Sequence, residues 1–213
     1  MKFKLFFLLC LYTTIGYSQN CNCDSNKLLK SIINCTPNTF SNGNSLKWNY
    51  DCNASYLVFE NKEDSKILFE LEAPLLELTR RLGYAYWKEF NQYFIIQNKV
   101  VSGSQPAEYI LFDKDTGNEV KQLGYQLGES KEIIYFLDFS NEDQLAIIAF
   151  DKKASGYKTI DLPNEIIENS MRNSNYIWLI QLFKIENIET DEPILMIEIH
   201  NEKGDIDYFQ QAL

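Results

Sequence analysis

The most common side chains of general acid–base catalysis are represented in this sequence by thirty acidic residues and a single histidine, His200. A Ser-His-Asp triad would have to use His200 as its base, but the sequence holds no Gly-x-Ser-x-Gly turn to supply the serine. Hydrolytic zinc sites built from several histidines are excluded, since the chain has one. His200 follows the apolar run 194–199, so we expect it at the end of a strand, facing water.

The acidic segment 113–119 allows two functional interpretations. Asp115-Thr116-Gly117 is the triplet of aspartic proteases, but those enzymes need two such carboxylates that share a proton, and a second triplet is missing. Asp113, Asp115 and Glu119 also offer oxygen atoms for calcium, without the glycine and the ligand spacing of an EF-hand loop. The segment favours a polar hairpin turn in which Gly117 takes a positive φ.

Glycoside hydrolysis needs two carboxylates about 5–10 Å apart, and thirty acidic residues can meet that requirement in many ways. Most of them lie in turns or alternate with apolar residues, as Glu186, Glu189 and Glu198 do, which is typical of solvated strand faces. The sequence has no P-loop and no Gly-x-Gly-x-x-Gly fingerprint, so we expect no nucleotide and no other cofactor. A protein without catalytic activity is therefore favoured.

Aromatic residues are concentrated in the stretch 84–94. Exposed aromatic rings stack on sugars or anchor protein interfaces, whereas aromatic rings in strands usually pack inward. Inward packing is therefore the favoured interpretation, and Tyr84, Tyr86 and Trp87 are the candidate residues for an aromatic binding platform as the alternative.

The first eighteen residues have the features of an export signal. Lys2 and Lys4 give a positive start, residues 5–15 form an apolar stretch, and Gly16 and Ser18 are the small residues of a cleavage site. A membrane-spanning helix needs about 20 apolar residues, so this stretch is too short to anchor the chain. We expect cleavage after residue 18 and a location in the periplasm or outside the cell.

Cysteines 21, 23, 35 and 52 remain after removal of residues 1–18. An even number of cysteines in an exported chain predicts two disulfides. Cys21 and Cys23 are too close in sequence to pair, so two sets are left: 21–35 with 23–52, or 21–52 with 23–35. A thiolate metal site is the alternative, but Cys-x-Cys is tighter than the usual zinc spacing and no histidine is nearby, so we expect no metal.

From residue 45 onward the chain is expected to form strands. Four segments consist of a β-branched or aromatic run, a polar turn and a second such run, which predicts a β-hairpin. The fold class is therefore mainly β: an antiparallel meander of hairpins in a single domain, 45–213, that forms a sandwich, a barrel or a curved sheet. The hairpins are predicted at 56–69, 109–123, 146–162 and 194–209, with further strands at 84–90, 92–97, 133–139 and 176–185.

The four predicted hairpins resemble one another in sequence. Each has an apolar residue, namely Phe59, Phe112, Phe150 or Ile199, followed by polar residues, a lysine and a turn. These residues lie 53, 38 and 49 positions apart, near the ~40–50 residues of a propeller blade. A short propeller-like repeat is the alternative to the plain sandwich, barrel or curved sheet.

The N-terminal segment 19–53 carries the cysteines and a short predicted helix. Asp24 or Ser25 can cap this helix, whose apolar residues at 28, 29, 32 and 33 share one face. The disulfides would attach the helix to the first strands. Further helices are predicted at 73–83 and 163–169.

The acidic composition excludes one class of partner. A net charge of −10 and an isoelectric point near 4.7 argue against nucleic acid, whose phosphates need basic residues. The sequence favours an exported, non-catalytic, β-rich binding protein, with a protein partner ahead of a glycan. An acidic inhibitor or immunity-type protein that covers a basic partner is one form of this hypothesis. The alternative is an exported glycan-acting hydrolase that uses a pair of carboxylates.

Overall fold

The computed structural model of the chain describes residues 23, 26–75, 83–99, 105–141, 144–190 and 192–213. Within these residues the fold is mainly β, and every strand pair is antiparallel. The predicted fold class, an antiparallel meander of hairpins with a short N-terminal helix, is confirmed. The predicted signal segment 1–18 lies outside the described residues.

The strands form three sheets in which neighbours in sequence are neighbours in space. The described sheets all keep two open edges, so the barrel is excluded among the forms expected from the sequence. The first sheet contains β1 (Asn38–Thr39), β2 (Ser45–Tyr50), β3 (Ala54–Glu60) and β4 (Ser65–Glu72). The second contains β5 (Tyr84–Glu89), β6 (Tyr93–Asn98), β7 (Glu108–Asp113), β8 (Glu119–Glu129), β9 (Ile133–Asn141), β10 (Gln144–Asp151) and β11 (Gly156–Asp161). The third contains β12 (Phe183–Glu186), β13 (Ile194–His200) and β14 (Ile206–Ala212).

Strand β8 pairs with two partners along its length. Residues 119–125 pair with β7, and residues 125–129 pair with β9. At the change of partner, Gly124 has a φ of +79°, and a Cβ added there would lie 1.9 Å from the carbonyl oxygen of Leu137. A side chain does not fit at this point, so the sequence needs a glycine where one half of the sheet gives way to the next.

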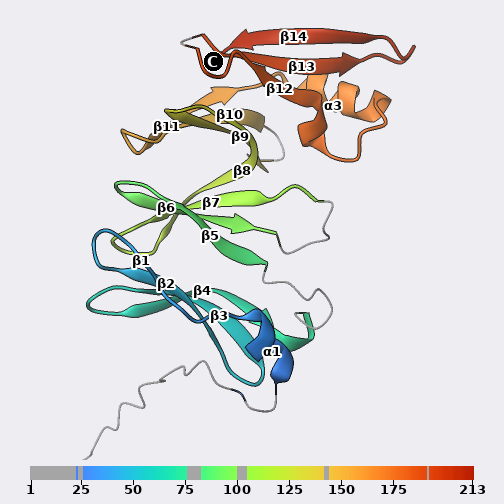
Figure 1. Ribbon diagram of the computed structural model, residues 1–213. Helices are drawn as coiled ribbons and strands as arrows, with labels where there is room; N and C mark the ends of the chain where they lie inside the picture. Colours follow the sequence, from blue (N-terminus) through green and yellow to red (C-terminus); the bar gives the residue numbers. More distant parts are fainter. Residues whose placement is uncertain (1–22, 24–25, 76–82, 100–104, 142–143, 191) are drawn as a thin grey trace, which may run out of the picture.

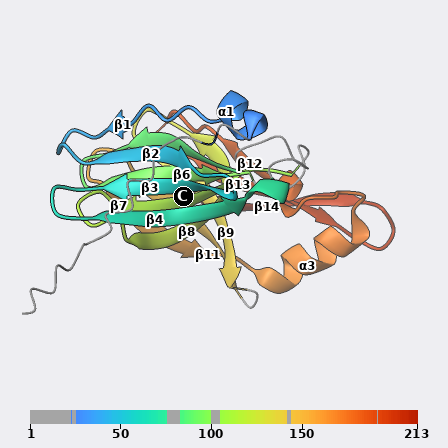
Figure 2. The same ribbon diagram turned by 90° about the horizontal axis from the view of Figure 1, so that it is seen from below.

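The strands stack in four layers between the N-terminal and C-terminal ends of the chain (Figure 1). Layer 1 is β1–β4, layer 2 is β5–β7 with residues 119–125 of β8, layer 3 is residues 125–129 of β8 with β9–β11, and layer 4 is β12–β14. Figure 2, seen from below, shows the layers lying over one another.

Layers 2 and 3 bury both of their faces. Since successive residues of a strand point to opposite sides, Ile96 of layer 2 packs against layer 1, whereas Ile95 packs against layer 3. In layer 3, Phe136 packs toward layer 2 and Leu137 packs toward layer 4. This arrangement explains why β6, β7, β9 and β10 contain continuous apolar runs rather than an alternating pattern.

All four predicted hairpins form, and each supplies the last two strands of its layer. Their turns begin alike, because an Asx side-chain oxygen accepts hydrogen bonds from backbone N–H groups two to four residues later. The Asx residues are Asn61, Asp113, Asp151 and Asn201. The strand predicted at 176–185 is shorter than expected, because residues Leu179–Leu182 form a 3-10 helix, η1, and β12 begins at Phe183.

Lys114 of layer 2 and Lys152 of layer 3 make the same contacts. Each follows a Phe-Asp pair, donates its backbone N–H to the preceding hairpin, and places its ammonium group on a glutamate and a backbone carbonyl. The partners are Gln92, Glu89 and Phe90 for Lys114, and Glu132, Glu129 and Ser130 for Lys152. The sequence resemblance between these two hairpins therefore corresponds to a shared pattern of contacts.

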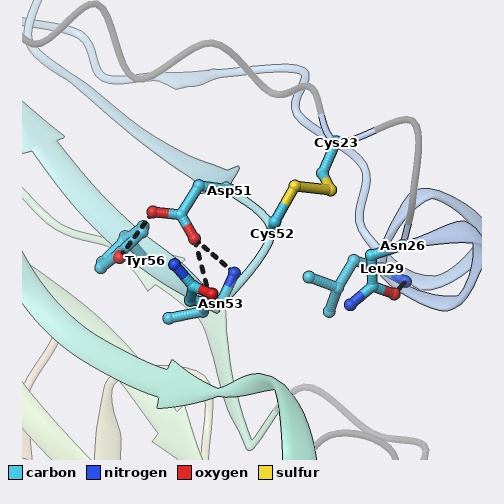
Figure 3. Close-up of a disulfide and its surroundings, with 8 residues drawn as sticks. Cys23, Asn26, Leu29, Asp51, Cys52, Asn53 and Tyr56 are labelled. Atoms are coloured by element: carbon cyan, nitrogen blue, oxygen red, sulfur yellow. Dashed lines mark hydrogen bonds between the residues drawn. A yellow bond between two sulfur atoms is a disulfide. The ribbon is translucent and has the colours of Figure 1, made fainter.

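The N-terminal helix α1 (Lys27–Ile32) is held by a disulfide and a cap. The Cys23–Cys52 bridge, with Cα atoms 5.1 Å apart, joins the start of the described chain to the turn after β2 (Figure 3). Oδ1 of Asn26 accepts a hydrogen bond from the backbone N–H of Leu29 at 3.1 Å, so the N-cap is Asn26 rather than residue 24 or 25. A six-residue helix is too short to be stable alone, and the bridge keeps the buried Leu29 in the core.

The Cys23–Cys52 bridge decides between the two predicted disulfide sets. It excludes 21–52 with 23–35 and is compatible with 21–35 and 23–52. Cys35 is also disulfide-bonded, and its predicted partner, Cys21, lies outside the described residues. A bridge across 29 positions contributes about 3–4 kcal/mol in the chain-entropy description.

Helix α3 (Asn164–Asn173) confirms the helix predicted at 163–169 and extends it. It packs beside β13, where the Ser170 hydroxyl donates to the carbonyl oxygen of Glu198 at 2.6 Å and accepts from the backbone N–H of His200 at 2.8 Å. These two bonds cover the edge of β13 beyond the end of β12. The helix predicted at 73–83 falls mostly outside the described residues.

Candidate binding groove

A groove of ≈730 Å³ lies between layers 3 and 4. Its floor is one face of β9, β10 and β11, and its walls are the turn 130–132 and residues 188–190 and 193 of the connection between β12 and β13. In Figure 1 the β10–β11 turn and the β13–β14 turn lie at opposite ends, so the last hairpin does not cover this end of layer 3. The volume falls within the ~300–1,000 Å³ of small-molecule sites.

The floor is hollow because its central residue is small. Tyr135 pairs with Ala149, which pairs with Lys158, so the three form one cross-strand row. In layer 2 the equivalent position is Leu111, which follows the same register and is fully buried against layer 3. Alanine in place of leucine leaves the space that the groove occupies.

Tyr135 brings a hydrogen-bonding group to this floor. Its side chain is buried, with 2% exposed, and its hydroxyl forms no hydrogen bond with a described residue. Among the described residues, no unpaired polar side-chain atom is sealed from water, so the Tyr135 oxygen is reached from the groove that the residue lines. Burial raises the pKa of Tyr135, which keeps the hydroxyl protonated and able to donate at neutral pH.

The groove carries side-chain charges of both signs. Within the described ranges, the side chains of Lys131, Glu132 and Lys158 form no ion pair or hydrogen bond. Glu189 accepts a long hydrogen bond of 3.4 Å from the backbone N–H of Lys131, and Asp151 accepts from two backbone N–H groups of its own turn at 2.7 Å. The groove thus offers charged donors and acceptors that are largely free for a ligand.

A second, much smaller depression of ≈110 Å³ holds two carboxyl groups with opposite pKa shifts. Burial raises the pKa of Glu108. Burial also acts to raise the pKa of Asp138, but hydrogen bonds from Lys121, at 2.7 Å, and Ser140 outweigh it and hold that pKa below its usual value. Two carboxyl groups whose pKa values are shifted in opposite directions are the pattern that acid–base hydrolysis requires.

The residues of the predicted aromatic platform, Tyr84, Tyr86 and Trp87, are half-buried and lie at two different layer boundaries. The Tyr84 ring stacks on the Phe69 ring with their centroids 3.7 Å apart, and Tyr86 packs near Phe40. Both tyrosines face layer 1. A bulge follows Tyr86, and Trp87 packs on Tyr109 at 4.6 Å toward layer 3, with the ammonium of Lys88 over its ring. The structure therefore brings two of the three rings together and places the third on the opposite face.

The segment 113–119 is the polar turn that the sequence favoured. The Asp113 carboxylate accepts hydrogen bonds from the backbone N–H groups of Asp115 and Thr116 at 3.1 and 2.8 Å, which commits it to the turn. Gly117 has a φ of +64°, as predicted, and a Cβ added there would lie 2.5 Å from the Phe59 ring. Within the described residues, no three His, Cys, Asp or Glu side chains are placed to hold a metal ion.

His200 ends strand β13 but is more covered than predicted. Its side chain is 11% exposed, since the ring of Tyr176 lies against it with the two ring centroids 5.3 Å apart. Nε2 of His200 lies 3.2 Å from the Glu198 carboxylate, to which the Tyr176 hydroxyl also donates at 2.6 Å. The expectation of a water-facing histidine is wrong, because a tyrosine before η1 folds back over the strand end.

Comparisons of the chain with protein-family models, curated proteins and solved structures find no match. None of the described helices is long and apolar enough to cross a membrane.

The groove residues were missed by reasoning from the sequence. Tyr135, Ala149 and Lys158 belong to three strands, so their sequence positions do not reveal that they form one row. The available signal was the alignment of the two Phe-Asp-Lys turns at 112–114 and 150–152, which places Ala149 opposite Leu111 as the unusual small residue.

Proposed function

We propose that the chain is an exported, non-catalytic binding protein that holds its ligand in the groove between layers 3 and 4. The observation that carries the proposal is the groove itself, whose floor presents the Tyr135 hydroxyl beside free charged side chains. Polar groups without an internal partner gain most from a ligand that satisfies them. The oppositely shifted carboxyl groups of Glu108 and Asp138 lie outside this groove, in the small depression.

Export is supported by two features. Residues 1–18 have the composition of a signal segment, and the Cys23–Cys52 disulfide is typical of oxidising compartments such as the periplasm or the cell exterior. Mass spectrometry of the exported protein should give an N-terminus at Gln19. An intact N-terminus at Met1 in the exported protein would contradict cleavage.

The charge of the whole chain favours a basic partner at the stage of encounter. Removal of residues 1–18 takes away two lysines and no acidic residue, which changes the net charge from −10 to −12. Opposite charge speeds diffusional association, so an acidic inhibitor or immunity-type protein is one form of the proposal. The groove itself contains both signs of charge, so contacts inside it are selected by hydrogen bonding rather than by net charge.

The test uses the oxidised chain 19–213, immobilised and exposed at low salt to the exported fraction of the source cells. Ala149→Leu introduces the residue that layer 2 has at the equivalent position, Leu111, and fills the floor of the groove. Lys184→Gln is the control, because it alters an exposed ion pair of layer 4 outside the groove. The proposal is supported by a species that the native chain and Lys184→Gln retain and that Ala149→Leu retains at least ten-fold less. This species must also be released with unchanged mass. Equal retention by all three proteins contradicts the groove, and a shortened species contradicts a non-catalytic role.

An exported glycan-acting hydrolase is the second candidate, and Glu108 with Asp138 is the observation that favours it. Its depression of ≈110 Å³ is smaller than the ~300 Å³ of a usual ligand site, which is why it ranks second. Aryl-glycoside substrates test it: turnover that falls at least a hundred-fold in Glu108→Gln and in Asp138→Asn supports hydrolysis. Turnover that is equal in the native chain and in both variants contradicts it.

A further inference from the structure

The free groups of the groove include both hydrogen-bond donors and acceptors. The Tyr135 hydroxyl and the ammonium groups of Lys131 and Lys158 donate, while the carboxylates of Glu132 and Glu189 accept. A ligand that satisfies both kinds must itself donate and accept at closely spaced positions. Hydroxyl groups do both, whereas carboxylates and phosphates only accept and ammonium groups only donate.

Charge in the groove does not select a strongly charged ligand. Two basic residues, Lys131 and Lys158, lie near the three acidic residues Glu132, Asp151 and Glu189. The opposite signs largely cancel, in a chain whose overall charge is −10. An uncharged polar ligand therefore fits the groove better than a polyanion or a polycation.

The shape of the groove suits a flat ligand with an apolar side. Ala149 makes the floor shallow, and Gly156 faces open space, because a Cβ added there would meet nothing within 4 Å. Ile133 and Ile160 lie on the same face as Ala149 and give the floor apolar side chains, whereas the ring of Tyr157, which pairs with Phe150, lies on the opposite face of the sheet. A ligand with an apolar face, such as the C–H face of a sugar ring, can lie on this floor.

We infer that the groove is a saccharide-binding site for a short, uncharged oligosaccharide, with one sugar ring over Ala149 and a sugar hydroxyl hydrogen-bonded to Tyr135. This inference rests on the proposed binding function and names its ligand class. Lys158 and Asp151 flank the ring position in the same face of the sheet, where they contact further hydroxyl groups.

An extended peptide is the occupant that competes with a saccharide. The backbone N–H of Leu162 donates to the carbonyl of Leu145 at 3.0 Å. In an antiparallel pair, every second residue of a strand bonds to its neighbour and the residues between them point away. The backbone groups of Tyr157, Thr159 and Asp161 therefore point to the open edge of β11. A peptide would pair with these backbone groups and leave the Tyr135 hydroxyl unused. A saccharide needs that hydroxyl and not the strand edge.

The experiment measures binding of uncharged di- and tetrasaccharides of hexoses and N-acetylhexosamines to the oxidised chain 19–213 by NMR titration and calorimetry. We expect amide shifts at residues 133–135, 149 and 156–158. Tyr135→Phe removes one hydroxyl and should weaken binding about five- to ten-fold. Ala149→Leu should abolish binding, and Tyr208→Phe, an exposed tyrosine outside the groove, should leave it unchanged.

Several results would overturn the inference. The first is the absence of amide shifts in the groove residues at millimolar saccharide. The second is an unchanged saccharide affinity of Tyr135→Phe, measured on a variant that keeps native thermal stability. The third is amide shifts in the groove that unstructured peptides produce and no saccharide produces. The third result contradicts the saccharide as ligand and leaves the proposed binding function in place. Cleavage of a bound saccharide would support the ligand class and contradict the non-catalytic role.

Discussion

Lys114 shows how a charged residue can occupy the interior of a layered β fold. Its side chain is 5% exposed, and the three hydrogen-bond donors of its ammonium group reach Ser41, Glu89 and the carbonyl of Phe90 at 2.9, 2.9 and 3.0 Å. Because Ser41 belongs to the turn between β1 and β2, the ammonium connects layer 1 with layer 2. A buried charge is tolerated here because each of its donors has an acceptor.

Replacement of Lys114 by methionine should lower the free energy of unfolding by about 2–3 kcal/mol, because the Glu89 carboxylate loses its charged partner and keeps only the hydrogen bonds from Ser41, while the Phe90 carbonyl loses its side-chain donor. Lys152→Met removes the equivalent contacts at a side chain that is 21% exposed, so its effect should be smaller. Urea unfolding of both variants at neutral pH measures the difference. Equal losses would show that burial does not determine the contribution of these lysines.

At the level of elements, β8 decides how the chain passes from one layer to the next. Its eleven residues serve two layers in turn, and Gly124 occupies the position where the partner strand changes. The left-handed backbone at Gly124 and the approach of Leu137 both require the absence of a side chain. Without this change of partner, β7 and β9 would flank the same residues of β8, and the sheet β5–β11 would form one layer rather than two stacked layers.

Gly124→Ala should therefore destabilise the fold by about 3 kcal/mol or more, or prevent folding, because the new methyl group meets backbone atoms that have no room to move. Gly156→Ala is the matched control, since its Cβ would meet nothing within 4 Å and its effect should stay within about 1 kcal/mol. Thermal unfolding compares the two variants. Similar melting temperatures for both would contradict the close approach of β8 and β9.

At the level of the whole molecule, carboxylates tie the layers together near the turns. Burial acts to raise the pKa of Glu129, but hydrogen bonds from Lys152 and Lys88, at 2.6 and 2.5 Å, outweigh it and hold the pKa below its usual value. For Glu89, burial is outweighed in the same way by Ser41 and Lys114. These groups sit between neighbouring layers, so their ionisation is coupled to the stack as a whole.

Acid should therefore weaken the stack. A carboxyl with a lowered folded pKa gives its full stabilisation above the unfolded value, about 4.3 for Glu, and loses it as the pH falls through the folded value. Glu108, whose pKa is raised, contributes with the opposite sign, but the lowered group of Glu89, Glu129 and Asp138 outnumbers it. We expect urea midpoints to fall between pH 5 and pH 3, and Glu129→Gln to make that fall shallower. A midpoint that rises toward pH 3 would contradict this assignment.

The sequence by itself determined the class of the fold, the four hairpins, the turn at 113–119 with its left-handed Gly117, and α3. These features depend on contacts between residues near one another in the chain, such as the Asp113 carboxylate with the next backbone N–H groups. Apolar runs and turn residues report such contacts directly.

Only the tertiary structure decided how the hairpins stack, which cysteines pair, and where a ligand can bind. Tyr135, Ala149 and Lys158 become neighbours through the registers of β9, β10 and β11, and the groove above them exists because layer 4 is turned relative to layer 3. The aromatic residues at 84–87 are divided between two faces, because neighbouring residues of β5 point to opposite sides and both sides are covered by another layer. Register, bulges and layer orientation arise from long-range packing, which leaves no local pattern in the sequence.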